Sequence, residues 1–195
     1  GEHVEFVVTL DSSGVKQWVK TASRGQGIIS RALSFLNFRV HDAPLTSLGA
    51  AAALDDLGVV VGVYGTSTPY LNSTVNNTVI TQYGRTQFQV PADYQVGSAV
   101  NILCTVTESA PADTSAAIDI KLYRKAAPGV DIITNASQSI LGAASTVYTF
   151  IVDGTNLVPG EILDLRVASI VDDNAGASPN AVYNIEDISV VYIAA

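Results

Sequence analysis

Residues 147–167 read VYTFIVDGTNLVPGEILDLRV, and this stretch carries the clearest local structural signal in the chain. β-Branched and aromatic side chains fill 147–152, and apolar side chains alternate with other residues over 162–167. Both patterns are typical of β-strands. Between the two runs, Asp-Gly and Pro-Gly pairs supply the backbone angles that a chain reversal needs. The stretch therefore predicts two strands joined as a hairpin.

Similar strand-like runs recur through the rest of the chain. They lie at 79–90, 98–108, 116–124, 146–152, 161–170 and 182–193. Gly, Pro, Asn or Asp residues occupy the gaps between most of them. Many short strands at this spacing are typical of a sandwich or a jelly roll and not of βαβ units. We therefore expect an all-β fold, a jelly-roll β-sandwich.

The N-terminal segment has an alternating pattern of its own. Apolar residues occupy alternate positions 4, 6, 8 and 10, and the polar turn at 11–14 leads to a hairpin partner at 15–20. We expect an arm or hairpin over 1–44 and the jelly roll over 45–195. As an alternative, residues 2–10 form an ordinary strand of the chain's own sandwich.

The segment between this arm and the regular strands is less patterned. Residues 28–40 suit a helix by the spacing of Ile29, Leu33 and Leu36, but we expect a strand from about Leu33, because aromatic and β-branched residues follow it. Residues 41–57 read as a long connection with one helical turn over the small residues 49–53, and a further strand lies within 55–64. Residues 65–77 are rich in turn residues, so we expect no strand there.

Charge is scarce and unevenly spread. Apolar residues make up 48% of the chain and charged residues 14%, against about a quarter in a typical domain. Such a composition suits either a subunit buried in an assembly or a β-protein coated with Ser, Thr and Asn. The net charge is −8, with +2 on residues 1–41 and −10 on residues 42–195. An acidic body argues against nucleic acid as a partner, because phosphate binding needs clustered Lys and Arg.

Neither the cysteine nor the apolar runs indicate a membrane or redox role. Cys104 is the single cysteine, lies in an apolar run, and is expected to be a buried structural thiol. The longest apolar candidate, 57–64, is far shorter than the ~18 residues that a membrane span needs. We expect a protein that is made in a reducing compartment and has no membrane partner.

The chain lacks the usual motifs of catalysis and metal binding. His41-Asp42 is a tempting pair, but neighbouring residues on a strand point to opposite faces. Zinc needs several His or Cys ligands, and the chain has only His3, His41 and Cys104, which lie far apart. The carboxylate groups at 172–173 with Asp113, and at 161 with 164, lack the spacing of a calcium loop and are expected to be solvated. We expect no catalytic residue, no metal and no cofactor.

Several segments together resemble a known family. They are Phe88-Gln89-Val90-Pro91, the run 117–123, Leu157-Val158-Pro159-Gly160-Glu161, and Asp55-Asp56-Leu57-Gly58. In these the chain resembles the jelly-roll decoration, or cement, proteins on the capsids of tailed bacteriophages, over roughly residues 45–195. The resemblance implies a virion structural protein, often a homotrimer, made in the host cytoplasm. Such a protein sits on the outer capsid surface and bridges neighbouring major capsid proteins.

The N-terminal arm offers contacts for such a role. An extended strand can add to a neighbour's sheet through main-chain hydrogen bonds. Phe6, Trp18 and Arg24 are the expected partner-binding residues, because they are apolar or basic and lie outside the regular strands.

Carbohydrate binding is the alternative function. Such modules stack sugar rings on exposed aromatic side chains. We expect Tyr64, Tyr70, Tyr83 and Tyr94 to converge on one rim if the chain binds a glycan. As an alternative, these side chains line the edge of the core with wet hydroxyl groups.

Overall fold

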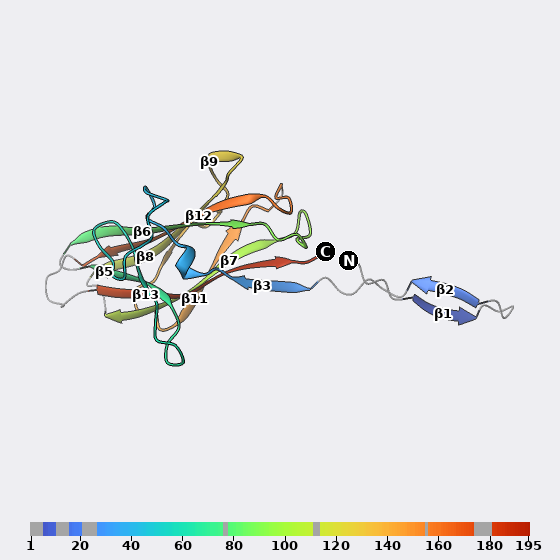
Figure 1. The fold of residues 1–195 in the computed structure, drawn as a ribbon, viewed down its shortest axis with the longest axis horizontal. Coiled ribbons are helices and arrows are strands. Elements are labelled where there is room, and N and C mark those ends of the chain that lie inside the picture. Colours follow the sequence, from blue (N-terminus) through green and yellow to red (C-terminus); the bar gives the residue numbers. More distant parts are fainter. Residues whose placement is uncertain are drawn as a thin grey trace.

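A computed structural model describes residues 6–10, 16–20, 27–75, 78–110, 114–154, 156–173 and 181–195. Two antiparallel sheets face each other across a shared core (Figure 1). The first sheet has the order β11 (Thr146–Val152), β7 (Val100–Ala110), β13 (Ala181–Ile193), β5 (Tyr70–Val75) and β4 (Gly58–Val60), with β3 (Ile28–Ala32) also on β13. The second has the order β10 (Ser137–Ser139), β8 (Ser115–Arg124), β12 (Ile162–Asp172) and β6 (Val79–Gln89), with β9 (Ala127–Asp131) also on β8.

The order of the strands is that of a jelly roll. From β5 onward the chain crosses between the sheets at each connection except those from β8 through β9 to β10, so β5, β7, β11 and β13 lie in one sheet and β6, β8, β10 and β12 in the other. Within the sheets the spatial orders are β5-β13-β7-β11 and β6-β12-β8-β10. Eight strands in two such four-stranded layers make the double Greek key of a jelly roll. The expected fold class is therefore confirmed.

The core fills the space between the two inner faces. On β7 and β8 alternate side chains are buried, as the period of two requires. The buried set is aliphatic and aromatic, and its largest fully buried members include Tyr183, Tyr192, Phe38 and Phe150. Cys104 is fully buried and free of any disulfide, which confirms the expected structural thiol.

Strand β13 holds two segments of the chain on one edge. Its first half pairs with β5 and its last five residues pair with β3, while β7 runs along the other edge. The register with β7 shifts between Ile185 and Asp187, close to the point where one partner gives way to the other. A bulge of this kind bends a strand and increases its twist.

Residues 33–57 cover the free edge of β6. Arg39 exchanges main-chain hydrogen bonds with Arg85, and Tyr83 bonds to residues 55 and 57 in the same way. Gly84 faces inward there, and a Cβ atom on it would lie 3.2 Å from Phe38. The lack of a side chain at Gly84 therefore leaves the space that Phe38 fills. A covered edge is protected from pairing with other chains.

The structure also revises several expectations from the sequence. The expected hairpin at 147–167 is wrong, because β11 pairs with β7 and β12 pairs with β6 and β8 in the other sheet. The strand expected from Leu33 is wrong as well: β3 ends at Ala32, and a single 3-10 turn, η1 (Phe35–Asn37), follows. No helical turn occurs over 49–53, which the structure describes fully. Strand β5 lies in the segment 65–77, where no strand was expected.

The N-terminal ribbon consists of β1 (Phe6–Leu10) and β2 (Lys16–Lys20), which pair in antiparallel register. Among the described strands, neither pairs with a strand of the sandwich (Figure 1). From Gly27 onward the chain belongs to the sandwich, because β3 pairs with β13 and Phe35 and Phe38 lie in the core.

Candidate functional site

One part of the outer face of the six-stranded sheet, on β3, β7, β11 and the last residues of β13, is formed by uncharged side chains. We call this region the neutral face, and define it by twelve residues on the outer side of β3, β7, β11 and β13, with Asp187, which pairs with Thr105, at its border. They are Ile28, Ser30, Ala32, Asn101, Leu103, Thr105, Val147, Thr149, Ile151, Ser189, Val191 and Ile193. Seven of the twelve are apolar and five carry hydroxyl or amide groups. In a chain of net charge −8, this is an unusual area of outer surface.

Branched apolar side chains stand exposed on the neutral face. Val147 and Ile151 are 56% and 51% exposed, and Ile28 is 76% exposed. Register places Ile151 beside Asn101 and Val147 beside Thr105, so β11 and β7 form one continuous surface. Scattered exposed apolar residues are normal, whereas neighbouring ones on an uncharged sheet mark an interaction surface.

The edge of β11 next to this face is already closed. The Asn135 side chain accepts a hydrogen bond from the Ile151 main chain at 2.6 Å and donates one to the Thr149 carbonyl at 2.9 Å. Gln138 donates a second bond to the same carbonyl, at 2.7 Å. These bonds occupy main-chain groups that an added strand would need. The surface available to a partner here is therefore the face of the strand and not its edge.

The outer face of the five-stranded sheet is built differently. Residues 27–195 contain seven Lys and Arg residues, and five of them lie on this face or in the turn at its end: Arg85, Lys121, Arg124, Lys125 and Arg166. A groove of about 480 Å³ runs over this surface. His41 lines it from the covering segment, and Pro128 and Gly129 line it from the β8–β9 turn. We call this surface the charged face.

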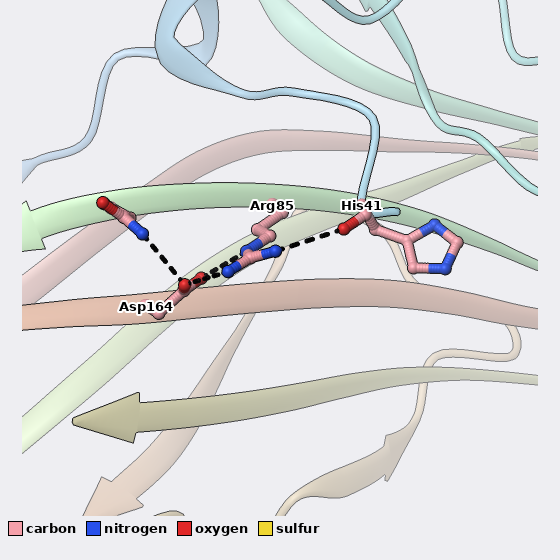
Figure 2. Close-up of polar contacts among 4 residues, drawn as sticks. His41, Arg85 and Asp164 are labelled. Atoms are coloured by element: carbon pink, nitrogen blue, oxygen red, sulfur yellow. Dashed lines mark hydrogen bonds and ion pairs between the residues drawn. The ribbon is translucent and has the colours of Figure 1, made fainter. Parts of the chain in front are cut away.

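Arg85 and Asp164 form the centre of the groove floor. Figure 2 shows the Arg85 guanidinium bound to both oxygens of Asp164 and directed to the main-chain carbonyl of His41. Gln87 donates a further hydrogen bond to Asp164, at 3.0 Å. Burial acts to raise the pKa of Asp164, but the bonds from Arg85 and Gln87 and the charge of Arg85 outweigh it, so the pKa lies below its usual value.

On the same face, Arg166 of β12 lies between its cross-strand partners Arg85 of β6 and Lys121 of β8. It donates to Asp119 at 3.0 Å, and its guanidinium lies 5.0 Å from the centre of the Tyr83 ring. The other neighbour of that ring is His41, with 4.4 Å between ring centres. The Nε atom of Arg166 is buried and makes no hydrogen bond. The residue is thus fixed on two sides and keeps one unused donor.

His41 pairs with a different carboxylate from the one that the sequence suggested. Its Nδ1 atom lies 3.9 Å from Asp56, not against the adjacent Asp42. The facing atoms of His41 and Asp56 are buried and make no hydrogen bond. Burial, followed by the charge of Asp55, raises the pKa of Asp56. No serine, cysteine or second histidine is among the residues that line the groove, so we see no catalytic triad there.

The remaining sequence candidates do not gather at either face. Phe6 and Trp18 lie in the N-terminal ribbon, where they pair with Lys20 and Val8, and Arg24 lies outside the described residues. Their role as partner-binding residues stays a prediction. Glu161 and Asp164 each bind an arginine, and the described residues contain no cluster of three or more potential metal ligands. Asp113 lies outside the described residues.

The four tyrosines that glycan binding was expected to bring together do not form one rim. Tyr94 is buried, and its hydroxyl donates to main-chain carbonyls at Ser98 and Gly154, so it is not wet either. Tyr70 lies on the outer side of the six-stranded sheet and Tyr83 on that of the five-stranded sheet, which separates them by the whole core. Tyr64 is fully exposed in a loop.

The groove was not predicted because its residues come from strands that are distant in sequence. Arg85, Lys121 and Arg166 look like scattered charges in the chain, and only the register brings them side by side. A usable signal was present for two of them, since Lys121 and Arg166 each stand between apolar residues on a regular strand.

Known structures provide only distant matches. No family model and no curated protein sequence matches the chain. A carbohydrate-binding module of the β-sandwich superfamily is 10% identical with a TM-score of 0.41, over 94% of this chain and 71% of its own. The xylan-binding module CBM15 is 12% identical with a TM-score of 0.39, over 85% and 97%.

A viral chain is also among the matches. A chain from the Gx strain of infectious bursal disease virus is 9% identical with a TM-score of 0.37, over 99% of this chain but 38% of its own. At these values the matches do not distinguish between functions, and the jelly-roll assignment rests on the strand order given above. None of the described helices is long and apolar enough to cross a membrane.

Proposed function

We propose that this chain is a non-catalytic virion structural protein that binds the outer surface of a capsid and bridges major capsid proteins. The neutral face is the observation that carries the proposal. Interface centres are depleted in charged residues, because a buried charge without a partner loses its hydration. The exposed branched side chains of Val147 and Ile151 gain from being covered, and the nearest charge on the outer side of these strands, Asp187, lies at the border of the neutral face.

The construction of the sandwich supports the same role. A jelly roll pairs most of its strand edges internally, and here side chains or loops cover further edges, at β11 and β6. A block of this kind presents a fixed surface with few edges that invite aggregation. Its face fits a partner of complementary shape without first having to become ordered.

The assembly that we propose is a homotrimer. Several copies held together bind a symmetric lattice with a high effective concentration, so a modest contact at each neutral face yields firm attachment. The N-terminal ribbon contributes a second contact through Phe6, Trp18 and Arg24. An uncharged, multiply repeated contact suits a protein that stiffens a shell.

The experiment that tests this role uses virus particles assembled without the protein. The purified chain is added back, and the bound amount is measured by co-sedimentation. Saturable binding in multiples of three chains supports the proposal, and absence of saturable binding contradicts it. The chain lacking residues 1–25 is expected to bind more weakly while its sandwich still unfolds cooperatively. Unchanged occupancy of this truncated chain rules out the contribution of the ribbon.

A further inference from the structure

The groove on the charged face is a second surface that assembly through the neutral face leaves unused. The two faces lie on opposite sides of the core, because the neutral face is the outer side of the six-stranded sheet and the charged face is the outer side of the five-stranded sheet. A smaller hollow of about 360 Å³ adjoins the groove and shares Arg85 and Gln87 with it. Arg39 lines that hollow, so cationic side chains follow the depression along its length. The volume of the groove is within the range of small-molecule sites, about 300–1,000 Å³.

The groove floor offers both donors and acceptors in fixed positions. Arg85, Gln87 and Asp164 hold one another by hydrogen bonds across two strands, which fixes three planar groups side by side. Guanidinium, amide and carboxylate groups can each make two hydrogen bonds side by side, and together they can donate to one sugar hydroxyl and accept from its neighbour. Asp164 also places a negative charge in the floor, so the anionic group of a ligand is expected to lie away from it, nearer to Arg166 and Lys125.

Unused positive charge remains at the groove. Arg124 binds Glu161 and Arg166 binds Asp119, yet Arg166 keeps a buried Nε donor without a partner. Within the described part of the chain, neither Lys125, which lines the groove, nor Lys121, which pairs with Arg166 on the same face, has a carboxylate within ion-pair distance. A buried donor without a partner calls for an explanation, and a bound acceptor is one. The two lysines add attraction for an anionic group.

We propose that this groove binds a saccharide that carries a carboxylate group. The sugar hydroxyls bind the floor of Arg85, Gln87 and Asp164. The sugar carboxylate binds toward Arg166 and Lys125, and the half-buried Tyr123 ring provides an apolar surface for a sugar ring. This activity does not depend on the capsid-binding role. If both hold, the neutral face binds the shell and the groove faces the medium.

The test measures binding of three probes to the full chain by NMR titration: trigalacturonate, a mannuronate trimer and 3′-sialyllactose. Each is compared with its neutral methyl ester. We expect saturable shifts for at least one acid, with the shifted amides on β6, β8 and β12, and at least tenfold weaker binding of its ester. Absence of saturable binding by all three acids overturns the proposal. Equal binding of an acid and its ester overturns the role of the carboxylate.

Variants and a competitor separate specific binding from general charge attraction. Lys125→Gln and Arg166→Gln are each expected to weaken binding about tenfold, because each loses a charge-assisted bond. Arg31→Gln removes one positive charge from β3 in the other sheet and is the matched control, with affinity within twofold of the parent. Thermal unfolding verifies that each variant is folded. Tetraglutamate binding as tightly as the best sugar acid overturns the saccharide in favour of an acidic peptide. None of these outcomes changes the capsid-binding result.

Discussion

The two outer faces of the sandwich enclose one core but differ in chemistry. The neutral face contains no charged residue among its twelve, whereas the charged face holds five of the seven Lys and Arg residues of 27–195. The inner faces of both sheets are alike, with buried aliphatic side chains at alternate positions. Folding therefore constrains the inner residues of each strand, and the outer residues are free to serve function.

The difference also determines which face suits a protein partner. On the charged face, ion pairs such as Arg85–Asp164 already satisfy one another. Covering these ion pairs with a protein partner would remove the water that still hydrates them. The free energy of this desolvation is often larger than the gain in attraction within the pair. The neutral face loses little hydration when it is covered. A protein interface is thus favoured on one side, and a small polar ligand on the other.

The largest effect is expected from placing charge on the neutral face. The double variant Val147→Glu/Ile151→Glu is expected to lower particle binding by roughly 30-fold or more, because two carboxylates would be buried without partners. Co-sedimentation measures it. Val130→Glu is the matched control, since Val130 is 63% exposed on β9, away from the neutral face, and is expected to bind normally. An equal loss of particle binding in both variants would mean that the neutral face is no more important for binding than the surface around Val130.

The free energy of unfolding should be more sensitive to substitutions on the charged face than to substitutions on the neutral face. Asp164→Ala is expected to lower the free energy of unfolding by about 2 kcal/mol, because Arg85 and Gln87 both lose their acceptor. Thr149→Ala on the neutral face is expected to cost less than about 0.5 kcal/mol. Urea unfolding followed by circular dichroism measures both. A cost at Thr149 as large as that at Asp164 contradicts the assignment of the polar network to one face.

The charged face is also expected to make stability depend on acidity. Folding lowers the pKa of Asp164 below its usual 3.8, so its contribution is complete above that value and is lost as the pH falls through the folded pKa. Asp164→Asn should therefore flatten the loss of stability as the pH falls below about 4. Val147→Glu should not reproduce this flattening. Urea unfolding at stepwise lower pH provides the comparison, and unchanged slopes in Asp164→Asn would contradict it.

The smallest effect is expected in the shared interior. Burial, followed by the charge of Asp187, raises the pKa of the Cys104 thiol, so the reactive thiolate is scarce in the folded protein. A thiol reagent should label Cys104 only as fast as the chain unfolds, and equally slowly in the Val147→Glu/Ile151→Glu variant. Mass spectrometry follows the label. Rapid labelling in the variant alone would attribute its binding defect to a damaged core.

The sequence predicts the inner half of this molecule better than the outer half. Strands such as β6, β7 and β13 are predictable because burial imposes alternation on their residues. The hairpin prediction at 147–167 fails because turn residues show that the chain reverses, not which sheet the next strand joins. Strand β5 was missed because its outward residues are Tyr, Asn and Thr among turn-like neighbours.

The two faces were beyond prediction for a related reason. Charge totals describe residues 42–195 as acidic, yet the register gathers Arg85, Lys121 and Arg166 into one cationic row. In the same way, Ile28, Leu103 and Ile151 become one surface only when β3, β13, β7 and β11 are paired. Contacts between strands distant in sequence create both surfaces, and no local pattern contains them.

The most direct test of the account is hydrogen–deuterium exchange on intact particles compared with the free protein. We expect slower exchange in peptides from β3 and β11, which carry the neutral face, and unchanged exchange in β9 and the turn that precedes it. Protection of β9 and the groove strands with β11 unchanged would show that the charged face binds the shell. That result would contradict the assignment of assembly to the neutral face.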